Sequence, residues 1–214
     1  MSDLFASNLQ FLITDDHLVI QQGLGYIIKE SFHKASISYS VSLNTTLILL
    51  EKQKFDILIL DINIPGGNDF HMVEKIKAIQ HDIKILIFSS YEETTYALRY
   101  LKAGANGYLE KNASEEQIIE AITSICRRGK YVSDQVKEQL LDSLNNNMLI
   151  KHGELTNREM EIAKFFAQGK GTSAISAKMN LQASTVSTHK KNIFEKLKIS
   201  NVAQLIEIFR MNHY

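Results

Sequence analysis

The 214-residue sequence is poor in cysteine, has no long apolar run and carries no net charge. Its single cysteine, Cys126, excludes an intramolecular disulfide and argues against a zinc site built on cysteine. No apolar run approaches the roughly 20 residues that span a bilayer. The N-terminus lacks the basic flank and the apolar stretch of a secretory signal. We therefore expect a cytoplasmic protein that contacts no membrane.

The net charge of zero hides an asymmetry along the chain. Residues 1–149 contain 14 Lys and Arg against 19 Asp and Glu, a net charge of −5. Residues 150–214 contain 10 against 5, a net charge of +5. An acidic body followed by a basic tail suggests that the tail binds a polyanion.

Two alternating patterns fill the first 130 residues. Short apolar runs predict strands over residues 11–13, 36–41, 57–60, 83–88 and 107–109. Stretches with helical spacing of apolar residues lie between them, at residues 18–28, 72–79 and 118–125. Strands that alternate with helices are typical of a parallel sheet covered on both faces. The pattern predicts five β/α units in a doubly wound α/β domain.

From Glu154 onward the apolar pattern is helical throughout. Thr156 and Glu159 match a capping box, and Gly169 ends the helix that follows it. Further helices are expected over residues 172–179, 183–197 and 202–211. Two helices joined by a tight turn, in a small basic domain, are typical of the helix-turn-helix motif.

Polar residues close the apolar runs of the predicted sheet. Asp15 and Asp16 end the first run, Asp61 the third and Ser89 the fourth, and Lys111 follows the fifth. Ligands bind at the carboxyl ends of strands in open α/β sheets, so these side chains should share one crevice. Clustered carboxylates need a cation, and oxygen ligands suit Mg²⁺. With the metal bound, one carboxylate can attack phosphorus while the lysine and the hydroxyl neutralise phosphoryl oxygens.

These motifs resemble a known family over nearly the whole chain. Residues 9–129 resemble a response-regulator receiver domain, and residues 155–209 resemble a DNA-binding domain of the LuxR type. The receiver matches are Asp15-Asp16-His17, residues 61–66, Ser89-Ser90 and residues 104–111. The C-terminal matches include residues 155–159, residues 167–169, Ile175, Thr185-Val186, His189, Asn192-Ile193, Lys196-Leu197 and Asn201. Together they resemble the NarL/FixJ family of two-domain transcription regulators.

The resemblance implies a flavodoxin-like receiver over residues 1–130, a linker over 131–152 and a LuxR-type helix-turn-helix domain over 153–214. It also implies that the protein is not an enzyme. Its implied partners are a sensor histidine kinase, double-stranded promoter DNA, a second copy of the chain on activation, and RNA polymerase.

The resemblance also assigns roles in the acidic pocket. Asp61 would receive the phosphoryl group from the histidine kinase. Asp16, Asp61 and the backbone carbonyl of Asn63 would hold Mg²⁺ directly, and Asp15 would act mainly through a coordinated water.

Three further residues would take part in the switch that the resemblance implies. Lys111 would pair with the phosphate, Ser89 would move to bond it, and Tyr108 would follow by turning inward. By its sequence position alone, Tyr108 is instead typical of a half-buried aromatic residue in a strand. The surface from about residue 91 to residue 128 would change on phosphorylation.

The helix over residues 183–197 is the candidate recognition helix. By the family's pattern, Ser187, Thr188 and Lys191 would contact base edges. Lys190 and Lys196 are better placed for phosphates, which position a protein without specifying sequence. Thr185, near the helix start, is also expected to reach a phosphate.

Three residues depart from the family's pattern. Asp69 replaces a usual glycine, so we expect a left-handed backbone conformation there. Gln182 replaces the usual Ser or Thr cap of the recognition helix, which can cost about 1 kcal/mol. Ser187 is small where relatives often carry a longer or charged side chain, so fewer direct base contacts are expected.

Three alternative functions share part of this pattern. A phosphatase or phosphotransferase of the haloacid-dehalogenase type needs a second Asp two residues after the nucleophile, and that position is Asn63 here. A phosphorylation-independent regulator would use the receiver only as a dimerisation module, but degenerate receivers usually lose a pocket residue and none is lost here. A small-molecule sensor with the same DNA-binding domain ranks lower still, because the receiver motifs argue against it.

Overall fold

A computed structural model describes residues 8–67, 69–138 and 155–211. The chain divides into two compact units, Met1–Asp142 and Ser143–Tyr214, which we call the N-terminal and the C-terminal unit. The division falls inside the predicted linker of residues 131–152, most of which lies outside the described residues. The predicted domain boundaries at 130 and 153 therefore stay a prediction. None of the helices in the described part combines the length and apolar character needed to cross a membrane.

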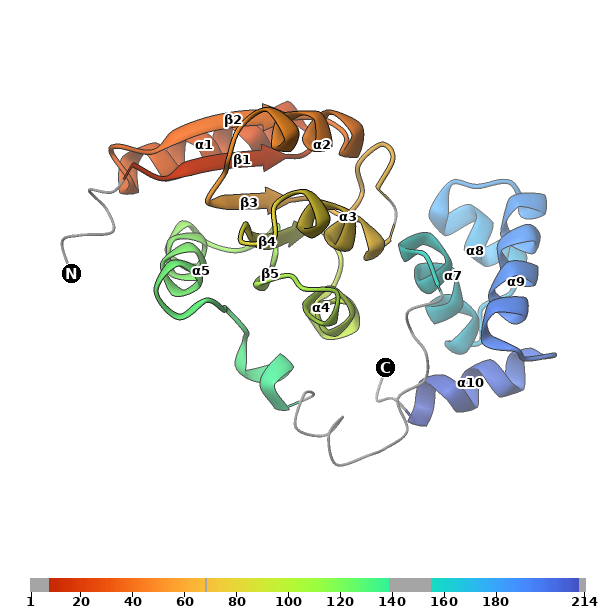
Figure 1. The fold of residues 1–214 in the computed structure, drawn as a ribbon. Coiled ribbons are helices and arrows are strands. Elements are labelled where there is room, and N and C mark those ends of the chain that lie inside the picture. The colour runs from red at the N-terminus through yellow and green to blue at the C-terminus, as the bar shows by residue number, and fades with distance from the viewer. Residues whose placement is uncertain (1–7, 68, 139–154, 212–214) are drawn as a thin grey trace. The chain divides into compact units, whose positions relative to one another are not determined.

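The N-terminal unit contains a five-stranded parallel sheet in the order β2-β1-β3-β4-β5 (Figure 1). The strands are β1 Gln10–Thr14, β2 Ser36–Ser40, β3 Ile57–Leu60, β4 Lys84–Ser89 and β5 Gly107–Glu110. The central strand β3 is entirely apolar and buried, as a strand covered on both faces must be. Parallel neighbours place all strand ends of one kind at one edge of the sheet. The predicted doubly wound architecture is confirmed.

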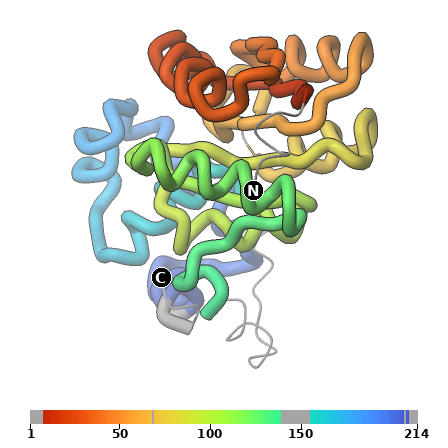
Figure 2. The backbone as a smooth tube through the Cα atoms, turned by 90° about the vertical axis from the view of Figure 1, so that its left-hand side faces the viewer, coloured from red at the N-terminus to blue at the C-terminus, as the bar shows by residue number. Residues whose placement is uncertain are grey.

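Helices follow each strand of the N-terminal unit. They are α1 Leu18–Ser31, α2 Leu43–Lys52, α3 His71–Ile79, α4 Glu93–Lys102 and α5 Glu115–Arg128. α1 and α5 pack side by side, seen in red and green in Figure 2. Their apolar residues form one core with alternate residues of the strands, such as Ile28 and Ile122 against Phe11 and Ile59. The intervening strand residues point to the other face of the sheet, away from α1 and α5.

Local backbone signals set several of the boundaries. Gly129 ends α5 in the left-handed conformation with φ 78°, which glycine adopts without steric cost. The backbone N–H of Tyr131 then donates to the Asn106 carbonyl at 2.9 Å, so the chain stays attached to β5 beyond residue 130. Gly107 makes this approach possible, because a Cβ there would lie 3.1 Å from the Tyr131 carbonyl oxygen.

The expectation of a left-handed backbone at Asp69 is wrong. Among the described residues, only Asn180 and Lys198 are non-glycine residues with positive φ. The Asp69 side chain instead accepts the backbone N–H of His71 at 2.9 Å, where α3 begins. An aspartate whose side chain bonds the backbone N–H two residues further on needs no glycine-like conformation.

The C-terminal unit is helical throughout its described residues. It comprises α7 Asn157–Ala167, α8 Thr172–Met179, α9 Ala183–Leu197 and α10 Val202–Met211. The predicted capping box is present, because the Thr156 and Glu159 side chains each accept the other residue's backbone N–H. Asn180 ends α8 at φ 50°, and Gln182 makes no side-chain cap bond to α9, as expected. Fully buried Ile162, Ile175, Val186, Ile193 and Leu205 form the core of the unit.

Candidate phosphoacceptor pocket and DNA-binding surface

The carboxyl ends of three strands bring the predicted pocket residues together. The register pairs Thr14 with Leu60, so Asp15 and Asp61 emerge side by side from β1 and β3. Both side chains are nearly fully buried. Lys111 follows β5, and its backbone N–H donates to the Ser89 carbonyl at the end of β4. The sheet therefore gathers residues that lie far apart in the sequence.

One ammonium group bridges the two buried carboxylates. Lys111 Nζ lies 2.6 Å from Asp15 Oδ2 and 2.8 Å from Asp61 Oδ2. Burial by itself would lower the pKa of Lys111, but hydrogen bonds to Asp15 and Asp61 outweigh it and raise that pKa. Burial also raises the pKa of Asp61, and the hydrogen bond from Lys111 only partly opposes it. The pocket is a compact arrangement in which negative charge exceeds positive charge.

The remaining donors fit a divalent cation. Ligand atoms of Asp15, Asp16, His17 and Asp61 all lie within 4.8 Å of one another, and Asp16 is exposed to solvent. A set of carboxylate oxygens with an open, wet side suits Mg²⁺, which keeps several waters. The Asn63 backbone N–H donates to Asp61 Oδ1 at 3.2 Å, which brings this loop to the pocket. The predicted roles of the Asn63 carbonyl and of Asp15 through water stay predictions.

Two residues that the sequence reasoning gave no role lie against this pocket. His17 Nδ1 is 2.7 Å from Asp16 Oδ1 and 3.1 Å from Asp15 Oδ1. Gln21 is buried, and its amide donates to the Asp15 and Ser40 carbonyls at 2.7 and 2.8 Å. This amide holds the chain where it leaves β1. A polar residue at a buried helix position was the signal that could have identified Gln21.

The predicted switch residues lie in the two strands that follow β3 in the sheet, Ser89 in β4 and Tyr108 in β5. Ser89 is fully buried, and its hydroxyl accepts the backbone N–H of Tyr91 at 3.2 Å. The Tyr108 hydroxyl donates to the Tyr91 carbonyl at 2.9 Å, and burial raises the pKa of Tyr108 well above its usual value. The Tyr108 side chain is therefore already inward in this structure, and not half-exposed. Its movement, and that of Ser89, stay predictions.

The candidate recognition helix α9 presents the predicted base-reading residues. Ser187, Thr188 and Lys191 are exposed, and Thr185 is half-buried. The hydroxyls of Ser187 and Thr188 donate to carbonyls one turn earlier on the helix, at 2.9 and 3.0 Å. Lys191 has only a loose contact with Glu195 at 3.8 Å. These side chains can therefore exchange their present partners for DNA at small cost.

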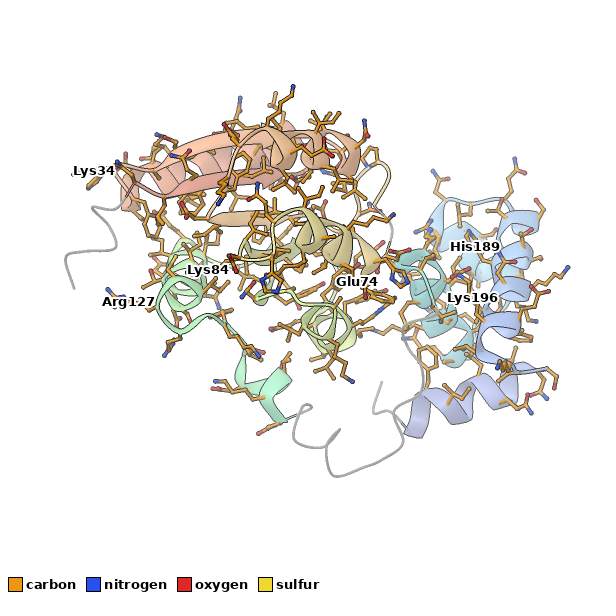
Figure 3. The ribbon with its side chains drawn as sticks, in the orientation of Figure 1. Lys34, Glu74, Lys84, Arg127, His189 and Lys196 are labelled. Carbon is orange, nitrogen blue, oxygen red and sulfur yellow. The ribbon has the colours of Figure 1, made fainter. Side chains whose placement is uncertain are left out.

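The two lysines predicted to contact phosphates have partners within the domain. Lys190 Nζ lies over the rings of Phe166 and Phe194, 5.3 and 5.4 Å from their centroids. Lys196 Nζ lies 2.6 Å from Glu159 Oε2, on the side of α9 that faces α7 (Figure 3). Burial would raise the pKa of Glu159, but the Lys196 hydrogen bond and the Thr156 N–H outweigh it and lower that pKa. Lys196 thus ties α9 to the cap of α7, and its contact with DNA stays a prediction.

Comparison with known proteins gives this geometry a family. The family model described as response regulator receiver domain matches residues 11–123, which is more than half of the chain. The chain belongs to the response regulators. A second model, described as bacterial regulatory proteins of the luxR family, matches residues 153–209. This pair of domains makes the response regulator one of the NarL/FixJ type, a two-component, DNA-binding transcription regulator.

Curated relatives align with this response regulator along nearly their full length. Fimbriae Z protein of Salmonella typhimurium is 28% identical, with 92% of this chain and 93% of that protein covered. Oxygen regulatory protein NreC of Staphylococcus carnosus is 28% identical, with 93% and 95% covered. The RcsB response regulator of Salmonella typhimurium has a similar structure, with TM-score 0.58, 20% identity, and 95% and 98% covered. RcsB in a DNA complex gives TM-score 0.58 at 21% identity.

The ion pair between Lys196 and Glu159 gives a stability prediction for the C-terminal unit. Lys196→Gln leaves the buried Glu159 carboxylate without its cation, and we expect a loss on the order of 1–2 kcal/mol. The loss is smaller than for a fully buried pair, because Lys196 is 36% exposed. Urea unfolding followed by circular dichroism measures it. Lys191→Gln is the control, since its pair is exposed and we expect a change of at most about 0.5 kcal/mol. Equal stability of the two variants would contradict a structural role for Lys196.

Asp61 gives a pH-dependent stability prediction for this response regulator. Its pKa is higher in the folded state than the unfolded value of 3.8, so stability from this group falls as pH rises through 3.8 toward the folded pKa. Asp61→Asn removes that loss. Without metal, we expect the variant to have a higher Tm than wild type at neutral pH, with the difference shrinking below the unfolded pKa. Differential scanning fluorimetry in a chelator over a pH series measures this. A difference that is constant over the whole series would contradict the assignment to the Asp61 carboxyl.

Proposed function

We propose that this response regulator accepts a phosphoryl group on Asp61 from a histidine kinase, and that phosphorylation controls dimerisation and sequence-specific binding to promoter DNA. The observation that carries the proposal is the contact of Lys111 Nζ with the Asp15 and Asp61 carboxylates at the carboxyl edge of the sheet. RNA polymerase is the further partner on such promoters, and the cytoplasm is the proposed compartment.

The chemistry follows from the pocket residues. The Asp61 carboxylate attacks phosphorus, the bond from phosphorus to the kinase imidazole breaks, and an acyl phosphate remains on Asp61. The Lys111 ammonium, already 2.8 Å from Asp61 Oδ2, then neutralises phosphoryl oxygen charge. When bound to Asp16 and Asp61, Mg²⁺ supplies further neutralisation. The Ser89 hydroxyl, buried at the end of β4, becomes a donor to the phosphoryl group.

The output step uses the C-terminal unit. A basic helix-turn-helix domain with exposed Ser187, Thr188 and Lys191 on α9 supports binding in the major groove. Among the structurally similar proteins, one structure is described as two RcsB dimers bound to two parallel DNAs. We extend the dimeric, DNA-bound form to this chain. Dimers with a two-fold axis bind paired half-sites.

The test combines a small phosphodonor with an unbiased DNA library. The full chain is treated with acetyl phosphate and Mg²⁺, or left untreated, and each sample selects duplexes from a random-sequence pool. We expect one phosphoryl group by intact mass, a dimer by light scattering, and enrichment of paired half-sites from the treated sample. The same enrichment from both samples would show a phosphorylation-independent regulator that uses the receiver for dimerisation. No enrichment from either sample would contradict sequence-specific DNA binding.

A further inference from the structure

Two lysines of the C-terminal unit lie over one aromatic ring. Lys170 Nζ is 4.9 Å and Lys178 Nζ is 4.7 Å from the centroid of the Phe165 ring. Phe165 lies on α7, Lys170 precedes α8, and Lys178 lies near the end of α8. The negative face of an aromatic ring attracts ammonium groups, so the ring gathers both charges in one place. We call Phe165, Lys170 and Lys178 the lysine cradle.

The cradle holds two positive charges with no carboxylate paired to them in the described part of the chain. The charge of Lys178, whose ammonium group lies over the same ring, is the main cause that lowers the pKa of Lys170. Among the described residues, neither lysine has a carboxylate within ion-pair distance. The described carboxylate side chains of this unit pair elsewhere: Glu159 with Lys196, Glu161 with Arg158, and Glu195 with Lys191. An external anion would therefore relieve the repulsion between the two lysines.

The position of the cradle in the helix-turn-helix motif favours a DNA phosphate as that anion. In this motif the second helix, here α9, enters the major groove, and the first helix, here α8, crosses the sugar-phosphate backbone. Gly171, which precedes α8, has no side chain to cap it, so the first N–H groups of α8 stay open beside Lys170. The positive end of the helix dipole adds to the lysine charges. An acidic protein surface would also match the charge of the two lysines. DNA is favoured because the helix-turn-helix geometry already places α8 against the sugar-phosphate backbone.

We propose that Lys170 and Lys178 together bind one stretch of the DNA phosphate backbone, with Phe165 holding both ammonium groups ready for it. The inference rests on the proposed DNA binding and adds to it a contact that reads no base. Because the ring already restricts both side chains, binding a phosphate loses less side-chain entropy than it would with free lysines. The cradle thus contributes affinity and orientation, while α9 contributes specificity.

The salt dependence of DNA binding tests the cradle. The full chain and the variant K170Q/K178Q are titrated onto a labelled mixed-sequence duplex at several NaCl concentrations, by fluorescence anisotropy. We expect the slope of log K against log salt to become less steep by about 2 in the variant, or by about 1 in each single variant. K170R/K178R keeps both charges and should restore the wild-type slope. K34Q/K54Q is the matched control, because it removes two exposed lysines of the N-terminal unit and the same net charge.

The outcomes separate the cradle from the proposed function. A slope in K170Q/K178Q equal to that of K34Q/K54Q, with wild-type binding intact, overturns the cradle and leaves DNA binding standing. That result would favour an acidic protein surface as the partner of these lysines. Wild type that binds no duplex at any salt concentration overturns both. A slope that falls in K170Q/K178Q and returns in K170R/K178R supports the cradle, because misfolding of the glutamine variant would not depend on the charge of the replacement.

Discussion

Asp61→Asn is expected to abolish phosphoryl uptake from acetyl phosphate. The neutral amide oxygen is a much weaker nucleophile than a carboxylate, and it cannot form a stable acyl phosphate. The Asp61 side chain is only 3% exposed. Asparagine has nearly the same shape, so the pocket should keep its packing. Intact-mass measurement after incubation with acetyl phosphate and Mg²⁺ gives the result directly. The dimer and the tighter DNA binding of the treated protein should be lost together with the phosphoryl group.

The specificity of that loss depends on a neighbouring carboxylate. Asp15 lies in the same pocket and shares Lys111 with Asp61, so it is the alternative acceptor. Uptake that persists in Asp61→Asn at the wild-type level would transfer the acceptor role to Asp15. Asp82→Asn is the matched control, since Asp82 is fully exposed and its ion pair is with the exposed His81. This control should take up phosphate as wild type does.

The pocket could be predicted because its position depends on topology. Near-continuous apolar runs such as Ile57–Leu60 identify buried parallel strands, and all such strands end at one edge. Once five strands are assigned, Asp15, Asp61 and Lys111 must meet, whatever the details of the loops. The positions of the helices in the C-terminal unit were also predictable, because Thr156, Gly169 and Asn180 are local start and stop signals.

The side-chain partners that join one helix to another could not be predicted from the sequence. Periodicity places Lys196 on α9, but nothing local says that its partner is Glu159, 37 residues earlier, across the helix pair. The same holds for Lys190, which lies over Phe166 of α7. The DNA contacts expected of both lysines rest on sequence position alone and stay predictions. Gln21 was missed for a related reason, since its amide binds the carbonyl of Asp15, just after β1, and that of Ser40, at the end of β2.

A family pattern also misled at one loop. A glycine in relatives suggested that Asp69 needs a left-handed backbone, but its carboxylate instead accepts the backbone N–H of His71. A turn before a helix can form with a glycine in a left-handed conformation or with an aspartate whose side chain bonds the backbone. The sequence alone does not tell which of the two occurs.

Lys111→Gln should slow phosphoryl uptake by about 100-fold without abolishing it. The variant removes the ammonium group that lies 2.6 Å from Asp15 Oδ2 and 2.8 Å from Asp61 Oδ2. Loss of one preorganised group that neutralises developing negative charge typically costs on the order of 10²–10³ in rate. The pKa of Asp61 should also rise further, because hydrogen bonding and charge from Lys111 now oppose the effect of burial.

This reasoning makes the pH profile of Lys111→Gln the decisive measurement. With less opposition to burial, the Asp61 carboxylate ionises at higher pH, so uptake at constant Mg²⁺ should begin at higher pH than in wild type. Stopped samples analysed by intact mass give the rate at each pH. Lys102→Gln is the control, since Lys102 is exposed on α4 and should change neither rate nor profile. A slower rate with an unshifted profile would mean that Lys111 acts on the transferred phosphoryl group alone, and that the carboxylate pair controls the ionisation of Asp61 without it.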